Sequence, residues 1–146
     1  MPRFEDVTVG DELPSLVKAP DREQLVKYAA GSGDFNPLHY DADFPQARTL
    51  GDNIVHGRMK YASLGQLVSD WLGPVGRVVR LAANYRGMDM RGAKFVCRGQ
   101  VTGKREEGGG RLVDLELWTE AEAESAEDSP RRTTTGTATV ELAAGS

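Results

Sequence analysis

Apolar and polar residues recur with a helical period over residues 57–72. A step of about 100° per residue places the apolar side chains of this segment within one arc and most of its polar side chains on the opposite arc. The apolar arc holds Tyr61, Leu64, Leu67, Val68, Trp71 and Leu72, and the polar arc holds Arg58, Ser63, Gln66, Ser69 and Asp70. Lys60 falls inside the apolar arc, in the first turn, and we expect its long side chain to reach water from there. The pattern predicts a long amphipathic helix over residues 57–72.

A shorter helix is predicted between Asp21 and the run Gly31-Ser32-Gly33. Asp21 and Gln24 have the spacing of a capping box, and the acidic side chain suits the positive end of a helix. The glycines then end the helix. A short strand is expected before Pro20, and residues 34–56 read as loop because proline, asparagine and glycine interrupt them repeatedly.

Strand patterns dominate the second half of the chain. Segments rich in Val, Leu, Thr and aromatic residues cover residues 77–86, 93–103, 111–119 and 132–142. The alternation is clearest in the third segment, where Val113, Leu115 and Leu117 alternate with polar or larger residues. Helices in the first half and strands in the second indicate an α+β domain, in which the apolar arc of residues 57–72 covers one face of the sheet. Residues 120–132 are acidic and polar, so we interpret them as a solvated loop inside a single domain of residues 1–146.

Composition and charge exclude several classes of protein. The chain has 146 residues, which suits one domain, and a single cysteine, Cys97, which is expected to be a buried, inert thiol. No apolar run approaches the ~20 residues of a membrane span, and the first residues do not resemble a signal peptide, so a cytoplasmic protein without membrane association is expected. A formal net charge of -4 disfavours nucleic-acid binding.

Six basic residues lie close together in the sequence. They are Arg77, Arg80, Arg86, Arg91, Lys94 and Arg98. They could bind a phosphate-bearing ligand, but we favour the interpretation that they are solvated residues of strand edges and loops.

The most specific pattern is Gly-Asp-Phe-Asn-Pro-Leu-His-Tyr-Asp at residues 33–41, followed by Ile-Val-His-Gly at residues 54–57. These two motifs resemble the hydratase motif of the MaoC-like family of (R)-specific enoyl-thioester hydratases and dehydratases. The resemblance implies a single hot-dog fold, in which an antiparallel sheet wraps around a long central helix. It also implies Asp34 and His39 as the catalytic pair, Gly57 as the donor to the thioester oxygen, and no metal or redox cofactor.

The chemistry of these residues agrees with that implication. Hydration of an enoyl thioester requires an activated water, a proton for the α-carbon, and stabilisation of negative charge on the thioester oxygen. Pro37 fixes its own φ and restricts Asn36, so the bend can bring Asp34 and His39 to one water, which the two groups can bind by accepting and donating. An imidazole titrates near neutral pH, which suits proton transfer. The sequence leaves open which of the two takes the first proton.

Gly57 is expected at the start of the long helix, where its N–H has no helical acceptor and a missing Cβ allows close approach of a carbonyl. Asn36 is a candidate for binding substrate beside Gly57, although a structural role bracing the loop is favoured. Asp34 as a simple turn cap and His39 as an ordinary loop histidine are the alternatives to catalysis. His56 is expected to brace the turn by hydrogen bonding.

Other helix residues receive structural interpretations. Ser63 is expected to be an ordinary helix serine, and Tyr61 and Trp71 core residues. Arg58 and Lys60 depart from the apolar or small residues that usually follow the Val-His-Gly turn in the family. Residues 71–74, Trp-Leu-Gly-Pro, resemble the helix exit of actinobacterial relatives that act on fatty-acyl and steroid side chains, which favours a bulky acyl group.

The sequence therefore predicts an enzyme that hydrates trans-2-enoyl thioesters, or dehydrates (3R)-hydroxyacyl thioesters, in fatty-acyl or related lipid metabolism. Its substrate is expected to be an acyl-CoA rather than a thioester of acyl carrier protein, and it is expected to work as a homodimer or with another hot-dog subunit. Two alternatives remain: an acyl-CoA thioesterase of the same fold, and a non-catalytic acyl-binding subunit.

Overall fold

The computed structural model describes residues 1–122 and 129–142, apart from the side chain of Val75. Its helices are α1 (Arg22–Ser32), the 3-10 helix η1 (Pro37–His39), α2 (Pro45–Leu50), α3 (Gly57–Leu72) and the 3-10 helix η2 (Gly73–Val75). Its strands are β1 (Leu16–Lys18), β2 (Arg77–Tyr85), β3 (Phe95–Glu107), β4 (Gly110–Ala121) and β5 (Arg131–Glu141). The predicted strands and both long predicted helices are present, with ends that differ by a few residues.

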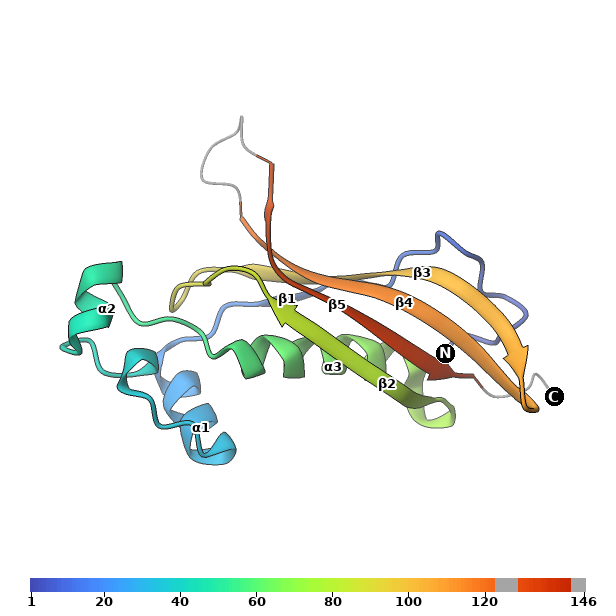
Figure 1. Cartoon of the computed structure of the whole chain (residues 1–146), viewed down its shortest axis with the longest axis horizontal. Coiled ribbons are helices and arrows are strands. Elements are labelled where there is room, and N and C mark those ends of the chain that lie inside the picture. The colour runs from blue at the N-terminus through green and yellow to red at the C-terminus, as the bar shows by residue number, and fades with distance from the viewer. Residues whose placement is uncertain (123–128, 143–146) are drawn as a thin grey trace.

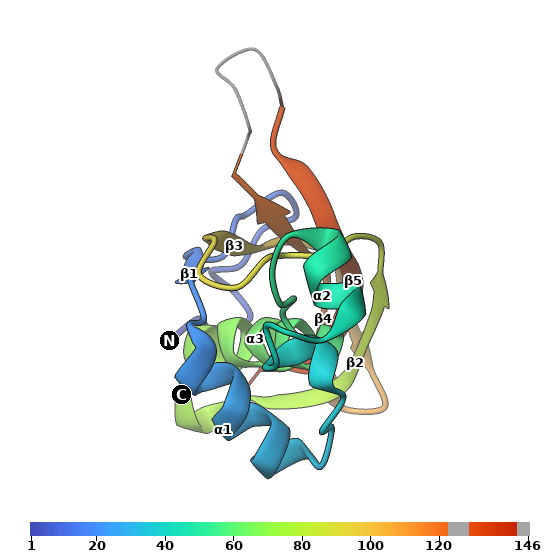
Figure 2. The same cartoon turned by 90° about the vertical axis from the view of Figure 1, so that its left-hand side faces the viewer.

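The five strands form one antiparallel sheet in the order β1-β3-β4-β5-β2. The sheet curves around α3, as the end-on view in Figure 2 shows, while α1 and α2 lie together at one end of the molecule (Figure 1). This arrangement confirms the α+β prediction and the hot-dog fold. No helix among the described residues is long and apolar enough to cross a bilayer.

Helix α3 packs its apolar side against the sheet, but the buried arc is rotated from the predicted one. Leu64, Leu67, Val68 and Leu72 are buried as expected, together with Lys60 and Ser63. Tyr61 is instead 37% exposed, so the prediction that it is a core residue was wrong. Lys60 is enclosed by Gly87, Asp89 and Thr133, while the Tyr61 hydroxyl lies near the Leu81 carbonyl of β2 with its ring partly exposed. Periodicity alone does not specify this direction.

The prediction for Lys60 was also wrong. Its side chain is 2% exposed and pairs with Asp89, so it does not reach water. A cation buried in a helix needs a partner of opposite charge, and the loop that supplies Asp89 lies outside α3. Trp71 is half-buried and packs against the core, and the Ser63 hydroxyl donates to the Met59 carbonyl at 2.8 Å, an ordinary helix contact.

The ends of the helices follow local sequence rules. The capping box predicted for α1 is present, since Asp21 accepts from the Gln24 N–H and the Gln24 side chain accepts from the Asp21 N–H. The loop prediction for residues 34–56 was wrong in part, because this segment contains η1 and α2. Pro45 begins α2, where its missing N–H is not needed, and Gly51 ends it with a φ of 92°.

The loop predicted at residues 120–132 is shorter than expected. Glu120 pairs with Arg132 and Ala121 with Arg131, so β4 and β5 extend into both ends of it. Glu120 also accepts from Arg98 and from the Trp118 indole, contacts that hold the strand end. Residues 123–128 of this segment lie outside the described residues.

Most of the clustered basic residues are paired with acids. Arg77 pairs with Glu141, Arg91 with Asp52, Lys94 with Glu122, and Arg98 with Glu120. These contacts at strand edges and loops agree with the interpretation as solvated surface residues.

Candidate active site

The loop between α1 and η1 carries the first motif. Gly33 ends α1 with a φ of 74°, a conformation that suits glycine. Asn36 then starts η1, because its side-chain oxygen accepts from the Leu38 N–H at 3.0 Å and Pro37 occupies the first position of the turn. The side chain of Asn36 is thus engaged in the structural role that was favoured for it, and its role in substrate binding stays a prediction.

The loop brings Asp34 and His39 together. The Oδ2 atom of Asp34 lies 3.8 Å from Nε2 of His39, and the exposed fractions of the two side chains are 42% and 10%. The other oxygen, Oδ1, accepts from the Asn36 N–H at 3.3 Å, which orients the carboxylate. The separation exceeds that of a direct hydrogen bond, so the two groups face a common space at the surface.

The hydrogen bond between His39 and the Ile54 carbonyl determines which of the two imidazole nitrogens carries the hydrogen. The other nitrogen faces Asp34. Nδ1 lies 2.8 Å from the Ile54 carbonyl oxygen, and a carbonyl can only accept, so Nδ1 carries the hydrogen. In neutral His39 the Nε2 atom is therefore unprotonated and faces the carboxylate. Ile54 was not identified from the sequence as the residue that orients the imidazole.

His56 lies directly behind His39. The two rings stack with centroids 3.8 Å apart and planes inclined by 20°. The Nε2–H of His56 donates to the Asp34 carbonyl at 3.2 Å, and the centroid of the Tyr28 ring lies 5.0 Å from that of His56, with the planes inclined by 57°. This geometry agrees with the bracing role expected for His56, since its ring supports both members of the pair.

Burial of the imidazole, and then the neighbouring His39, hold the pKa of His56 below the usual value of 6.5. The unfolded chain therefore binds a proton at this residue at a higher pH than the folded chain does, and the contribution of His56 to stability is present above about pH 6.5 and declines as the pH falls below it. We expect the free energy of unfolding of the wild type to fall more between about pH 7.5 and about pH 5 than that of His56→Gln. Denaturant unfolding at both pH values measures the difference; equal pH dependence in the two proteins would contradict the assignment.

Gly57 begins α3 directly after this cluster. Among the described residues, no acceptor is found for the Gly57 N–H, as is usual for the first turn of a helix. A Cβ added at Gly57 would meet three ring atoms of Tyr85 at 3.1–3.2 Å, so the Tyr85 ring lies against the glycine. Tyr85, at the end of β2, was not identified from the sequence, because nothing local to β2 indicates that its end reaches the start of α3.

A buried asparagine holds the segment that precedes the second motif. Asn53 is fully buried, and its Nδ2 donates to the carbonyls of Leu38 and Asp41 at 3.0 and 2.8 Å. These bonds join residues 53–55 to the loop that carries His39. Asn53 was also missed, since a single polar residue in a loop has no distinctive sequence signal.

The sequence of residues 4–123 matches the family model described as MaoC like domain. The chain belongs to the MaoC-like dehydratase family. This match confirms the family that the two motifs were expected to indicate. The chain thus belongs to the hydratase/dehydratase class.

Three solved structures show how widely this MaoC-like fold is shared. The (R)-hydratase of A. caviae involved in PHA biosynthesis is 26% identical, with a TM-score of 0.79 and coverage of 95% of this chain and 99% of that chain. The unliganded R-hydratase PhaJ1 of Pseudomonas aeruginosa is 19% identical, with a TM-score of 0.84 and coverage of 98% and 86%. A chain of the ChsH1-ChsH2 complex of Mycobacterium tuberculosis is 20% identical, with a TM-score of 0.75 and coverage of 93% and 98%. The last two likenesses support the fold alone.

One curated relative matches a shorter stretch. The fatty acid synthase subunit beta of Gibberella zeae is 43% identical over 54 residues, which are 37% of this chain. The match spans 3% of the length of that protein.

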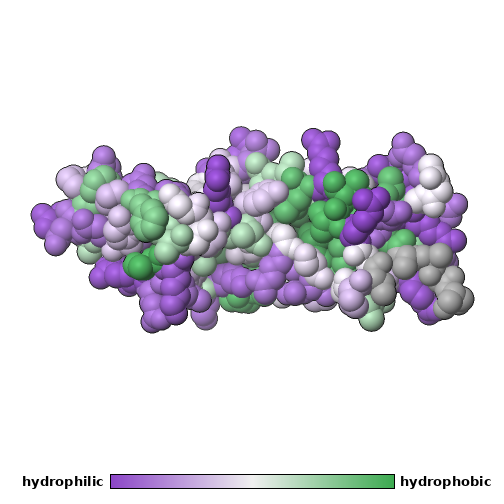
Figure 3. All heavy atoms as spheres, turned by 90° about the horizontal axis from the view of Figure 1, so that it is seen from below, coloured by the Kyte–Doolittle hydropathy of each residue, from purple (hydrophilic) through white to green (hydrophobic). Residues whose placement is uncertain are grey.

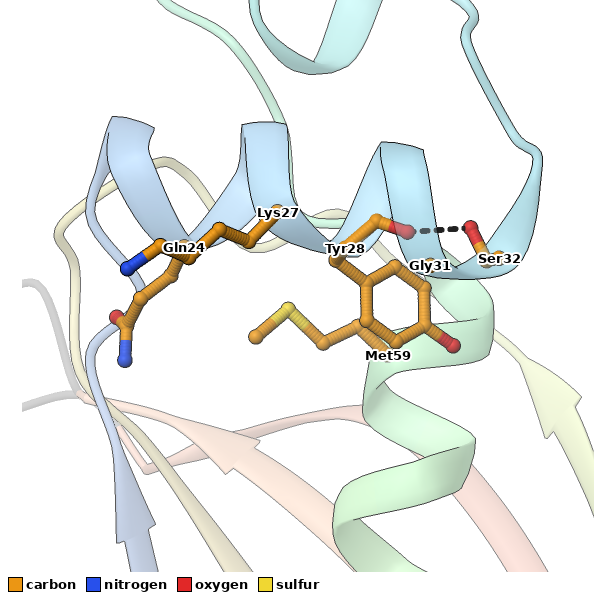
Figure 4. A pocket seen from close by; sticks show the side chains of 6 residues that line it. All are labelled: Gln24, Lys27, Tyr28, Gly31, Ser32 and Met59. Atoms are coloured by element: carbon orange, nitrogen blue, oxygen red, sulfur yellow. Dashed lines mark hydrogen bonds between the residues drawn. The ribbon is translucent and has the colours of Figure 1, made fainter.

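A shallow groove adjoins the cluster of Asp34, His39 and His56 in this MaoC-like protein. It has a volume of about 500 Å³ and is lined by Gln24, Lys27, Tyr28, Gly31, Ser32 and Met59. Figure 4 shows α1 on one side and Met59, from α3, on the other, with the Tyr28 ring between them. A second hollow of about 200 Å³ shares Gln24, Tyr28 and Met59 and continues toward Lys18, Ser63 and Gln66. Burial raises the pKa of Tyr28, which also packs on His56, so its phenol keeps its proton at neutral pH.

The cluster has metal-binding residue types but an unfavourable arrangement for a metal. Ligand atoms of Asp34, His39 and His56 all lie within 4.8 Å of one another. Nδ1 of His39 and Nε2 of His56 already form hydrogen bonds with carbonyl oxygens, so only the other nitrogen of each ring has a free lone pair. Because the two rings are stacked, these lone pairs lie in nearly parallel planes. Two ligands in such planes do not converge on one ion. A site without metal therefore stays our prediction.

Cys97 is a buried thiol on β3, as expected. Burial raises its pKa to about 12, so no thiolate forms near neutral pH.

Proposed function

We propose that this MaoC-like protein hydrates trans-2-enoyl thioesters, and catalyses the reverse dehydration of (3R)-hydroxyacyl thioesters, with Asp34 and His39 as the catalytic residues. The observation that carries the proposal is the separation of 3.8 Å between Asp34 Oδ2 and His39 Nε2, at the start of helix α3. The family places the chain in the hydratase/dehydratase class, and these two groups supply acid-base chemistry at one point.

The first step follows from the tautomer of His39. The carboxylate oxygen and the unprotonated Nε2 are both acceptors, which differs from the acceptor and donor expected from the sequence. One water can therefore donate a hydrogen to each and present its oxygen lone pair to substrate. As the water oxygen bonds to C3 of the enoyl group, one O–H bond breaks and its proton passes to Asp34 or His39. The C2–C3 π electrons move to the thioester as an enolate, and the group that took the proton then delivers it to C2, which completes the addition of water and returns both residues to their starting state. The geometry leaves open which of the two residues takes the first proton.

The enolate oxygen needs a hydrogen-bond donor. The Gly57 N–H is the donor that we propose, because it lies at the positive end of α3 and lacks an acceptor among the described residues. The absence of a side chain at Gly57 leaves room for the Tyr85 ring, three atoms of which lie 3.1–3.2 Å from where a Cβ would stand. The Tyr85 ring against Gly57 forms a wall beside the carbonyl.

The groove along α1 and α3 is the proposed acyl site. Tyr28 and Met59 form apolar walls next to the catalytic cluster, while Gln24, Ser63 and Gln66 line its continuation. The groove is open to the surface, which suits a bulky acyl group such as those of fatty-acyl or steroid side chains. We retain coenzyme A as the carrier, ahead of acyl carrier protein, because the exposed Arg58 beside Gly57 offers positive charge for phosphate groups.

A second hot-dog subunit is proposed to complete the site. Strand β2 is one of the two edge strands of the sheet and is paired only with β5 among the described strands. Its Val78 and Val79 are exposed, and Figure 3 shows an apolar area on the underside of the molecule in the region of β2. An exposed apolar edge strand favours pairing with another strand. The partner is a second copy or a different hot-dog chain; a cytoplasmic location also stays a prediction.

A panel of trans-2-enoyl-CoA substrates with short, long and steroid-type acyl groups tests the function. We expect loss of the enoyl absorbance while the thioester is retained, for the chain alone or mixed with hot-dog proteins encoded nearby. Release of free thiol from saturated acyl-CoA, without hydration, would indicate a thioesterase instead. Full turnover by a partner alone, unaffected by Asp34→Asn, would indicate a non-catalytic subunit.

A further inference from the structure

A charged pair is buried between the first turn of α3 and the loop that joins β2 to β3, and the proposed chemistry does not use it. Nζ of Lys60 lies 2.9 Å from Oδ2 of Asp89, and both side chains are 2% exposed. Nζ also donates to the Gly87 carbonyl at 2.6 Å and to the Thr133 carbonyl at 3.4 Å. The contact with Asp89 is an ion pair without aligned hydrogen bonding, since neither carboxylate oxygen has a hydrogen-bond donor among the described residues.

The position of this pair is unfavourable for stability. A cation in the first turn of a helix opposes the helix dipole, and a buried ion pair often contributes less to stability than apolar side chains of the same volume. A role in specifying one local conformation is the best-attested reason for such a pair.

Asp89 belongs to the loop between β2 and β3, and this loop forms a short ladder with residues 53–55. The Val55 N–H donates to the Asp89 carbonyl at 2.8 Å, and the Arg91 N–H donates to the Asn53 carbonyl at 2.9 Å. Ile54 and Met90 form an antiparallel bridge between these two contacts. The backbone of residues 53–55 is therefore held by the loop that Lys60 anchors to α3.

The middle residue of that ladder orients the catalytic imidazole. The Ile54 carbonyl accepts the Nδ1–H of His39 at 2.8 Å. A continuous set of contacts thus runs from Lys60 through the Asp89 loop and Ile54 to His39, while Lys60 itself lies one turn after Gly57 on α3.

We propose that Lys60 and Asp89 are positioning residues, which hold the Ile54 carbonyl where it keeps His39 in the Nδ1–H tautomer, with Nε2 toward Asp34. The consequence for the rate rests on the proposed hydratase function, but the consequence for the imidazole does not. Neither residue contacts the reacting atoms.

Nitrogen NMR of the imidazoles tests this directly, because His39 and His56 are the only histidines of the chain. We expect the wild type to show one tautomer of His39, protonated at Nδ1, and Lys60→Met to show a mixture of both tautomers. In the enoyl-CoA assay the same variant is expected to lose roughly 10- to 100-fold in kcat with little change in KM, as displacement of a catalytic group produces. The matched control is Leu67→Ala, which weakens the packing of α3 in the core and is expected to leave the His39 tautomer unchanged.

Lys60→Met leaves Asp89 buried without its partner, so the double variant Lys60→Met/Asp89→Leu provides a folded alternative. We expect it to regain thermal stability and still show mixed tautomers and a low kcat. A double variant with the wild-type tautomer and rate would overturn the proposal, as would an unchanged tautomer in folded Lys60→Met. A wild type without hydratase activity would contradict the proposed function, while the tautomer measurement would still decide the role of the pair.

Discussion

Asp34→Asn is expected to lower the turnover of an enoyl-CoA substrate by at least about 100-fold, with the fold intact. Asparagine has the same shape and its carbonyl oxygen can still accept from the Asn36 N–H, as Oδ1 of Asp34 does at 3.3 Å. Its amide nitrogen would then face Nε2 of His39 and donate to it, which removes both acceptors of the proposed water. His39→Ala is expected to have an effect of similar size, because it removes the Nε2 atom that faces Asp34 and accepts from the proposed water.

Steady-state hydration measured by loss of enoyl absorbance checks both variants, and circular dichroism with thermal unfolding checks that they fold. Asp43→Asn is the matched control for the carboxylate. Asp43 is exposed and pairs with Arg48 away from the catalytic cluster, so its loss is expected to leave turnover unchanged. A rate near that of the wild type in either Asp34→Asn or His39→Ala would refute the catalytic assignment.

Gly57→Pro is expected to lower kcat by roughly 100- to 1000-fold relative to Gly57→Ala, the range for loss of one donor to an oxyanion. Proline at the first position of a helix lacks only an N–H that the helix does not use, so α3 can form normally. His56, with φ of -55° and ψ of 132°, already has the extended conformation that a following proline requires. The proline therefore removes the proposed donor with little change in the backbone.

Gly57→Ala is the control because it adds the same Cβ and keeps the N–H. That Cβ crowds the Tyr85 ring at 3.1–3.2 Å, so both variants are best compared in a Tyr85→Ala background that makes room for it. Equal kcat values for the proline and alanine variants would show that the Gly57 N–H does not stabilise the transition state. Equal losses relative to the Tyr85→Ala parent would point to steric exclusion of the thioester instead.

The elements of the fold were largely predictable because their signals are local. The period of residues 57–72, the alternation in β4 and the capping box of α1 each depend on neighbours within a few positions. The helix α2 was missed because Pro45 and Gly51 punctuate a chain equally well as the first and last residues of a helix or as parts of a loop.

The family, the α+β order of elements and the two motifs that carry Asp34, His39 and Gly57 could all be predicted from the order of the residues. Pairing between distant segments decided the rest: which side of α3 the sheet covers, that Tyr85 lies against Gly57, and that Lys60 is neutralised by Asp89. The tautomer of His39 was decided in the same way, by a carbonyl 15 residues further along the chain. Such features depend on tertiary contacts. The free energy of a buried charge or of an oriented imidazole is set by neighbouring groups that are distant in the sequence.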